Sequence, residues 1–193
     1  MSLTCEKGVS KMGKHICPWW LAWTFDNPLR RLFHNPKKIF ASYIDEGMSV
    51  VDIGCGMGYF SIGMAKIVGE SGHVIAVDVQ QEMLDILLKR AKKESLSDRI
   101  QTVLCDVEDI AVDEQVDFAL TFWMVHETPN QHSFLKQVYG ILKQSGKLLL
   151  AEPKLHVTSS EFEKTVTIAE ALGFKLLDRP QICCSHTALF EKQ

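Results

Sequence analysis

The sequence has no long hydrophobic run and no excess of basic residues. No apolar stretch approaches the ~20 residues that a membrane-spanning helix needs, so we expect no membrane span. The 21 lysines and arginines are outnumbered by 24 aspartates and glutamates, which gives a net charge of −3. This balance provides no broad basic field, so nucleic acid is not an expected partner.

Cysteine is too sparse for a secreted, disulfide-stabilised scaffold. Six cysteines are spread over 193 residues, whereas such scaffolds concentrate them in much shorter chains. The first residues include lysines, but no continuous apolar segment with a small-residue cleavage site follows them. We therefore expect a cytoplasmic protein with reduced cysteines. The length and the 46% content of hydrophobic residues suit a sizeable core.

One stretch organises the rest of the chain: residues 48–60, M-S-V-V-D-I-G-C-G-M-G-Y-F. The apolar, mostly β-branched residues Val50, Val51 and Ile53 predict a strand that is buried on both faces. Three glycines at alternate positions follow, and then a helical pattern begins. Glycine lets a backbone turn sharply and approach a ligand closely, so this order is typical of a binding site in an open α/β sheet.

The spacing of the glycines reads D-x-G-x-G-x-G, with Asp52 ahead of Gly54, Gly56 and Gly58. A dinucleotide-binding loop would need a glycine at position 59, where this sequence has Tyr59. The pattern resembles motif I of the class I S-adenosylmethionine-dependent methyltransferases, of the small-molecule type that includes the ubiquinone-biosynthesis enzymes. This resemblance implies S-adenosylmethionine as the cofactor.

The order of the expected elements predicts an α/β fold. Strands are expected over residues 50–53, 73–79, 100–104, 116–122, 147–151, 174–182 and 186–191, with helices between the earlier ones. The last helix is expected to begin with a capping box at Ser160 and Glu163. The last two strands are joined by only a few residues, so they must be antiparallel. The resemblance implies a doubly wound, Rossmann-like sheet of seven strands in the order 3-2-1-4-5-7-6, with the last strand antiparallel and helices on both faces.

The residues ahead of the first strand concentrate tryptophan. Trp19 and Trp20 lie in an aromatic stretch that must bury its area against another part of the protein. We predict that residues 1–44 form an aromatic, helical lid over the substrate and that residues 45–193 form the S-adenosylmethionine-binding methyltransferase domain. Packing of the same stretch on the sheet is the alternative.

Acidic residues at the strand ends complete the expected cofactor site. Asp78 ends the second strand, where an open α/β sheet places a carboxylate for ribose hydroxyls. By the resemblance, Asp106 accepts from the adenine amino group, the Val107 amide completes the adenine edge, and Asp52 helps hold the ammonium group. The predicted cofactor-binding residues are Asp52, Gly54, Gly56, Gly58, Asp78, Val79, Asp106, Val107 and Phe122.

The transfer of a methyl group from a sulfonium needs mainly alignment and desolvation of the reactants. By the resemblance, Phe122 and Trp123 face the sulfonium and the substrate. A general base is required only if the acceptor keeps its proton until reaction. His126, in the loop after the fourth strand, is the candidate catalytic base, and a structural histidine within that loop is the alternative. Glu152, after the fifth strand, is a second position of interest.

Sulfur and imidazole groups suggest a further possibility at the same edge of the sheet. Cys183 and Cys184 are expected in the turn between the last two strands, and His15 and Cys17 belong to the predicted lid. We predict no firm metal site, but these four residues are candidate ligands for a soft metal or metalloid. Small buried hydrophobes and a solvated turn are the alternative reading.

Three functions remain open at this point. The first is a methyltransferase, monomeric or homodimeric, that acts on a small-molecule acceptor; nothing resembles the N-P-P-Y motif of amino-group methylation on bases or proteins. The second is an S-adenosylmethionine-binding or interaction module without catalysis. The third is a Rossmann-type nicotinamide oxidoreductase, which Tyr59 and the terminal hairpin oppose.

Overall fold

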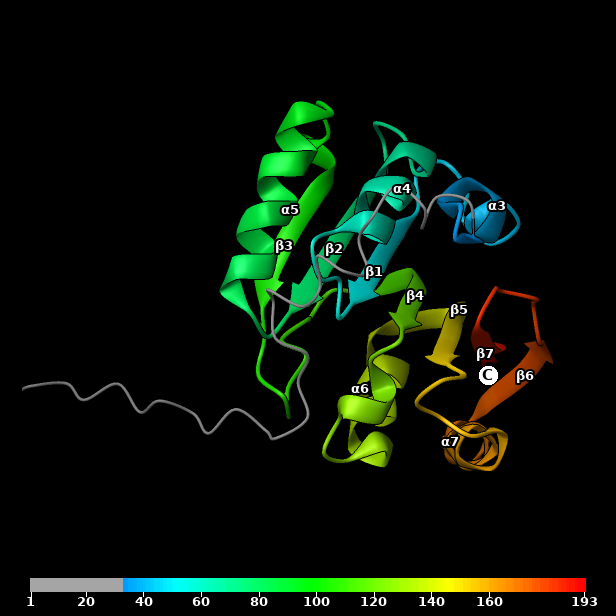
Figure 1. The fold of residues 1–193 in the computed structure, drawn as a ribbon. Helices are drawn as coiled ribbons and strands as arrows, with labels where there is room; N and C mark the ends of the chain where they lie inside the picture. Colours follow the sequence, from blue (N-terminus) through cyan, green and yellow to red (C-terminus); the bar gives the residue numbers. More distant parts are fainter. Residues whose placement is uncertain (1–32) are drawn as a thin grey trace, which may run out of the picture.

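The computed structural model describes residues 33–193, which form one seven-stranded sheet with helices on both faces (Figure 1). The strands are β1 Ser49–Ile53, β2 His73–Asp78, β3 Ile100–Leu104, β4 Val116–Phe122, β5 Leu142–Pro153, β6 Phe174–Asp178 and β7 Ser185–Lys192. The helices are α3 Pro36–Phe40, α4 Tyr59–Ile67, α5 Gln81–Lys93, α6 Gln131–Ile141 and α7 Ser159–Ala171, with 3-10 turns η1 Ser97–Arg99 and η2 Val125–Glu127.

The strand order is β3-β2-β1-β4-β5-β7-β6, which confirms the predicted order. Strands β1 to β5 pair in parallel, and β7 runs antiparallel to both β5 and β6. From β1 the chain builds outward through β2 to β3, and then returns to place β4 on the other side of β1. This reversal leaves a crevice at the carboxyl ends of β1 and β4, where ligands of open α/β sheets bind.

The sheet separates two hydrophobic cores. Successive side chains of a strand point to opposite faces, so Val50 packs with α3, α4 and α5, while Val51 packs with α6 and α7. All five residues of β1 are buried, as the continuous apolar run predicts. The central strands are therefore fixed from both sides, and their ends provide a rigid support for the loops above them.

Helix α7 begins earlier than its predicted capping box. Thr158 is the N-cap: its side chain accepts from the Glu161 amide at 3.3 Å, and the Glu161 carboxylate accepts from the Thr158 amide at 2.8 Å. The predicted box at Ser160 and Glu163 is wrong because both residues lie inside the helix. The sequence contains two overlapping patterns two residues apart, and the earlier one forms.

Candidate functional site

Three glycines carry the chain from β1 into α4. Gly54, Gly56 and Gly58 have φ angles of +73°, +53° and +80°, in the left-handed region that favours glycine. The amides of Gly54 and Cys55 both donate to the Val77 carbonyl, at 2.9 and 3.0 Å, which ties the loop to β2. The glycine spacing is thus required by the backbone of this loop.

The surroundings of the three glycines differ. A Cβ on Gly58 would lie 2.0 Å from Cδ1 of Leu87, so this glycine allows α5 to pack against the loop. A Cβ on Gly54 would lie 2.9 Å from Cγ of Met124, in the segment after β4. A Cβ on Gly56 would meet no atom within 4 Å. Gly56 is therefore the position where the loop presents bare backbone to open space.

Asp78, at the end of β2, is buried beside this backbone. Its carboxylate accepts from the Gly56 amide at 2.9 Å and from the Gln80 amide at 2.9 Å. Burial raises the pKa of Asp78, although the amides of Gln80, Gly56 and Val79 act in the opposite direction. The carboxylate keeps further acceptor capacity toward a ligand, because each oxygen carries two lone pairs.

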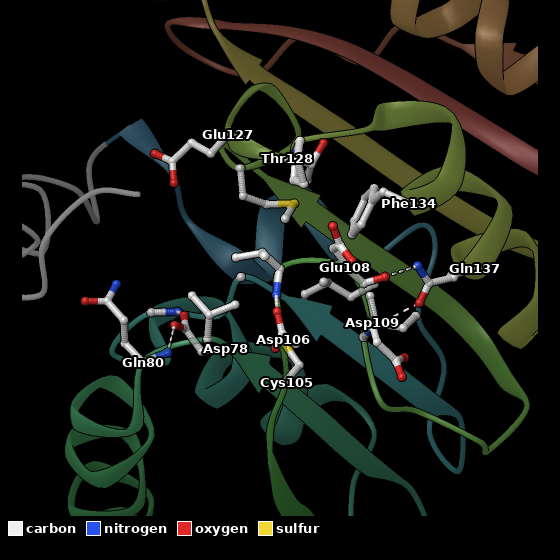
Figure 2. A pocket seen from close by; sticks show the side chains of 18 of the residues that line it. Asp78, Gln80, Cys105, Asp106, Glu108, Asp109, Glu127, Thr128, Phe134 and Gln137 are labelled. Atoms are coloured by element: carbon white, nitrogen blue, oxygen red, sulfur yellow. Dashed lines mark hydrogen bonds between the residues drawn. The ribbon is translucent and has the colours of Figure 1, made fainter. Parts of the chain in front are cut away.

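The loop after β3 forms the next wall (Figure 2). Asp106 is exposed, and its carboxylate accepts from the Val107 amide at 2.6 Å. Gln137 of α6 holds the loop from the other side: its side chain donates to the Glu108 carbonyl at 2.8 Å and accepts from the Ile110 amide at 3.1 Å. One glutamine thus fixes the main chain on both sides of Asp109.

These segments enclose one cavity. It is lined by Ile53, Gly54, Gly56, Asp78, Val79, Gln80, Met83, Cys105, Asp106, Val107, Glu108, Asp109, Ile110, Phe122, Trp123, Met124, Glu127, Thr128, Pro129, Phe134 and Gln137. Five of these described residues are acidic, and none of them is lysine, arginine or histidine. The walls of the cavity are therefore apolar, and all of its charged side chains are carboxylates.

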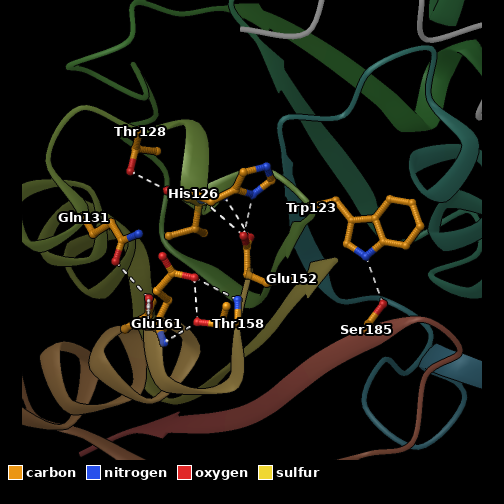
Figure 3. Close-up of polar contacts among 10 residues, drawn as sticks. Trp123, His126, Thr128, Gln131, Glu152, Thr158, Glu161 and Ser185 are labelled. Carbon is orange, nitrogen blue, oxygen red and sulfur yellow. Dashed lines mark hydrogen bonds and ion pairs between the residues drawn. The ribbon is translucent and has the colours of Figure 1, made fainter. Parts of the chain in front are cut away.

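Trp123 closes the end of the cavity next to β4. Its backbone has a φ of +61°, and its amide donates to the Ala151 carbonyl of β5 at 2.8 Å. Its indole Nε1 donates to the Ser185 hydroxyl at 2.9 Å (Figure 3). The Phe122 ring lies 5.2 Å from the Trp123 ring. The aromatic end of β4 is thus held by β5 and by the first residue of β7.

A buried carboxylate fixes the segment that follows Trp123. Glu152 of β5 accepts from the Val125 amide at 3.0 Å, from the His126 amide at 3.2 Å and from His126 Nδ1 at 2.5 Å (Figure 3). Burial alone would lower the pKa of His126, but the hydrogen bond and charge of Glu152 outweigh it, so this pKa is raised. With Nδ1 facing a carboxylate, the opposite ring nitrogen, Nε2, is left for other partners.

The cavity collects most of the predicted site residues. Those that line it are Gly54, Gly56, Asp78, Val79, Asp106, Val107, Phe122 and Trp123. Asp52, Gly58 and His126 do not line it: the Asp52 carboxylate, for example, is buried and accepts from the Ser61 hydroxyl at 2.5 Å. Trp19, Trp20, His15 and Cys17, with most of the predicted lid, lie outside the described residues.

The described residues contain no group of three or more histidine, cysteine or acidic side chains that could hold a metal ion. Cys183 and Cys184 lie in the turn before β7, and both are exposed. Sequence reasoning missed Gln137 and Ser185, for which no local pattern gives a signal. Within residues 33–193, no helix is long and apolar enough to cross a bilayer.

A family model described as a methyltransferase domain matches residues 44–182. The chain belongs to this family. The match confirms the predicted class I S-adenosylmethionine-dependent methyltransferase and its cofactor, and it gives no support to the nicotinamide alternative. The open space at the Gly56 backbone, beside the Asp78 carboxylate, suits a cofactor with a ribose and polar groups.

Two curated relatives carry quinone-related names. A demethylmenaquinone methyltransferase of Lactobacillus johnsonii is 32% identical over 118 residues, covering 60% of this chain and 48% of that protein. A ubiquinone/menaquinone biosynthesis C-methyltransferase of Vibrio vulnificus is 25% identical over 134 residues, covering 69% of this chain and 50% of that protein. The chain thus spans about half the length of the curated relatives it matches.

Solved structures share the fold. An S-adenosylmethionine-dependent methyltransferase from Aquifex aeolicus superposes with a TM-score of 0.81 at 23% identity, over 91% of this chain and 98% of that one. Fibrillarin from Aeropyrum pernix, in complex with natively bound S-adenosyl-L-methionine, superposes with a TM-score of 0.61 at 16% identity, over 77% and 68% of the two chains. At these identities the likeness concerns the fold.

Proposed function

We propose that this domain transfers the methyl group of S-adenosylmethionine to a small-molecule acceptor. The cavity that joins the Gly56 backbone, the Asp78 carboxylate and the aromatic end of β4 carries this proposal. When bound, the cofactor supplies a methyl group on a positively charged sulfur. The chain supplies binding, alignment and exclusion of water, which are the main requirements of this displacement.

The cofactor assignments divide the cavity into two ends. We infer that Asp78 accepts from the ribose hydroxyls and that Asp106, with Val107, meets the adenine. The glycine loop then lies at the methionine end. Asp52, our candidate for holding the ammonium group, is buried there and accepts from the Ser61 hydroxyl of α4. Support for this division comes from the positions of these residues at the ends of three adjacent strands.

A small molecule is the acceptor class that the lining favours. The phosphates of a nucleic acid would be repelled by the five carboxylates, and no lining residue among those described offers a compensating cation. The names of the two relatives point in the same direction, because quinones are small apolar molecules. A cytoplasmic location, and a monomer or homodimer as the functional unit, remain predictions.

His126 remains our candidate for the general base, with Glu152 as the residue that orients its ring. If His126 acts as a base, His126→Gln should lower kcat, remove the acidic limb of the pH profile and leave cofactor affinity unchanged. If the ring only holds the segment after β4, the same substitution should lower thermal stability without changing the shape of the pH profile.

Calorimetry with S-adenosylhomocysteine tests the cofactor part of the proposal. Asp78→Ala removes charge-assisted hydrogen bonds worth about 1.5–3 kcal/mol, so affinity should fall at least about tenfold. Asp106→Ala is the matched control at the exposed end of the cavity and should cost less. A larger loss for Asp106→Ala would reverse the assignment of the two ends, and tight binding of NAD without S-adenosylhomocysteine would overturn the proposal.

A transfer assay separates catalysis from mere binding. The purified protein is incubated with radiolabelled S-adenosylmethionine and a panel of quinones, phenols, amines and thiols, and label in the acceptor is counted. Transfer that Asp78→Ala diminishes would support the enzyme. Cofactor binding without transfer to any acceptor in the panel, or to added cell extract, would favour the non-catalytic module.

A further inference from the structure

The turn between β6 and β7 holds two adjacent thiols beside the methyl-transfer site. Cys183 and Cys184 are both exposed, and their sulfur atoms lie 3.4 Å apart. Neither residue lines the cavity described above. We propose that this pair is a second binding site, which takes a trivalent thiophilic metalloid of the arsenic(III) class as a two-sulfur chelate.

The backbone of the turn is already fixed with the two sulfurs together. Cys184 has a φ of +60°, which residues with a Cβ rarely adopt. Its carbonyl accepts from the Lys154 amide at 2.9 Å. The Cys183 carbonyl accepts from His34 Nε2 at 2.9 Å and from the Ser185 hydroxyl at 3.2 Å. Because two other segments and the adjacent Ser185 hold the turn, little conformational freedom remains to be lost when a ligand bridges the sulfurs.

The donor set favours a metalloid over a divalent metal ion. Structural zinc needs four ligands, and the described residues offer no group of even three. Soft sulfur selects soft partners, and two neighbouring thiols are sufficient for a trivalent arsenical that carries one organic group.

The binding step balances without an oxidant. For an arsenical R–As(OH)₂, two As–O bonds break and two As–S bonds form. Each thiol proton leaves with one hydroxide as water, and arsenic stays trivalent throughout. No reductant or further reactant is consumed, so the site can form on the reduced protein alone.

Ser185 connects this site to the cavity. Its hydroxyl accepts from the Trp123 indole at 2.9 Å and donates to the Cys183 carbonyl at 3.2 Å. Trp123 itself lines the cavity. The thiol pair therefore adjoins the acceptor end of the methyl-transfer site, but its binding activity is independent of methyl transfer and is measured without it.

Phenylarsine oxide is the probe. The full-length protein is reduced with a phosphine, freed of it, and mixed with the probe in the presence of excess glutathione; intact mass spectrometry then counts the adducts. We expect one phenylarsenic group per chain, which glutathione does not displace and 2,3-dimercaptopropanol removes. The variant Cys183→Ser/Cys184→Ser should bind none, and the control Cys5→Ser should bind as the parent does.

A second readout does not depend on any variant. Wild-type protein carrying one equivalent of probe is alkylated and mapped by peptide mass spectrometry, and Cys183 and Cys184 should be the protected residues. Protection of other cysteines, an adduct that survives in Cys183→Ser/Cys184→Ser, or a wild-type chain that holds no adduct against glutathione would each overturn the proposal. Binding of S-adenosylhomocysteine by the serine variant verifies that it is folded.

Discussion

Substitution of Gly58 by alanine tests how the glycine loop is built. The new Cβ would lie 2.0 Å from Cδ1 and 2.9 Å from Cγ of Leu87. Leu87 is fully buried, so its side chain has no open space into which it can move. Such overpacking of a filled core costs about 1–3 kcal/mol. The φ of +80° adds about 1–2 kcal/mol for a residue with a Cβ. Gly58→Ala should therefore destabilise the fold by about 2–5 kcal/mol.

Gly56→Ala is the matched control. It has a comparable left-handed φ of +53°, but its Cβ would meet nothing within 4 Å. Only the backbone term applies, so the loss of stability should be about 1–2 kcal/mol. The added methyl group would instead enter the cavity, so Gly56→Ala should lose more affinity for S-adenosylhomocysteine than its stability alone explains.

Urea unfolding, followed by circular dichroism, measures both free energies of unfolding. A double variant, Gly58→Ala/Leu87→Ala, completes the test, because Leu87→Ala alone should cost about 2–5 kcal/mol. If the methyl group introduced by Gly58→Ala clashes with Leu87, the double variant should lose clearly less stability than the sum of the two single variants. Equal urea midpoints for Gly56→Ala and Gly58→Ala, or strict additivity with Leu87→Ala, would refute the reasoning.

Three further predictions concern the segments around the cavity. Gln137→Leu removes two hydrogen bonds, each worth about 1 kcal/mol, from the loop after β3, so the dissociation constant of S-adenosylhomocysteine should rise several-fold in calorimetry while kcat is unchanged; unchanged affinity would contradict this. Because the pKa of His126 is raised in the folded state, its contribution to stability should be complete below about pH 6.5 and disappear as the pH rises through the folded value. Urea unfolding across this range should show that Glu152→Gln flattens the dependence. Deletion of residues 1–34 should abolish methylation but largely spare cofactor binding, and full turnover by the shortened chain would rule out the predicted lid.

The strand order followed from the family resemblance, whereas the strand, glycine loop and terminal hairpin could be predicted from local signals. The buried run of β1, the glycines after it and the short link before β7 each appear within a few residues of sequence. Element ends were less accurate for a similar reason. Strand β5 begins at Leu142, directly after α6, and ends at Pro153, whereas the predicted strand covered residues 147–151. The pairing with neighbouring strands extended β5 beyond its local pattern.

The residues of the candidate site also differ in whether a local sequence pattern reveals them. Gly56 and Asp78 could be found because one lies in the loop directly after a recognisable strand and the other ends one. The partnership of Glu152 with His126 joins residues 26 positions apart on different segments, so only the folded chain reveals it. Gln137 resembles any polar residue on an amphipathic helix, because nothing in its neighbours indicates that both ends of its amide meet the same loop.

The position of Glu152 affects any attempt to exchange the segment after β4, residues 123–129, between relatives. The segment that follows β4 owes its position to a carboxylate that belongs to β5. A chimera that imports only residues 123–129 would set a foreign loop over a buried negative charge, which is costly when no donor meets it. Residue 152 should therefore be exchanged together with residues 123–129 when an enzyme with a new acceptor is designed.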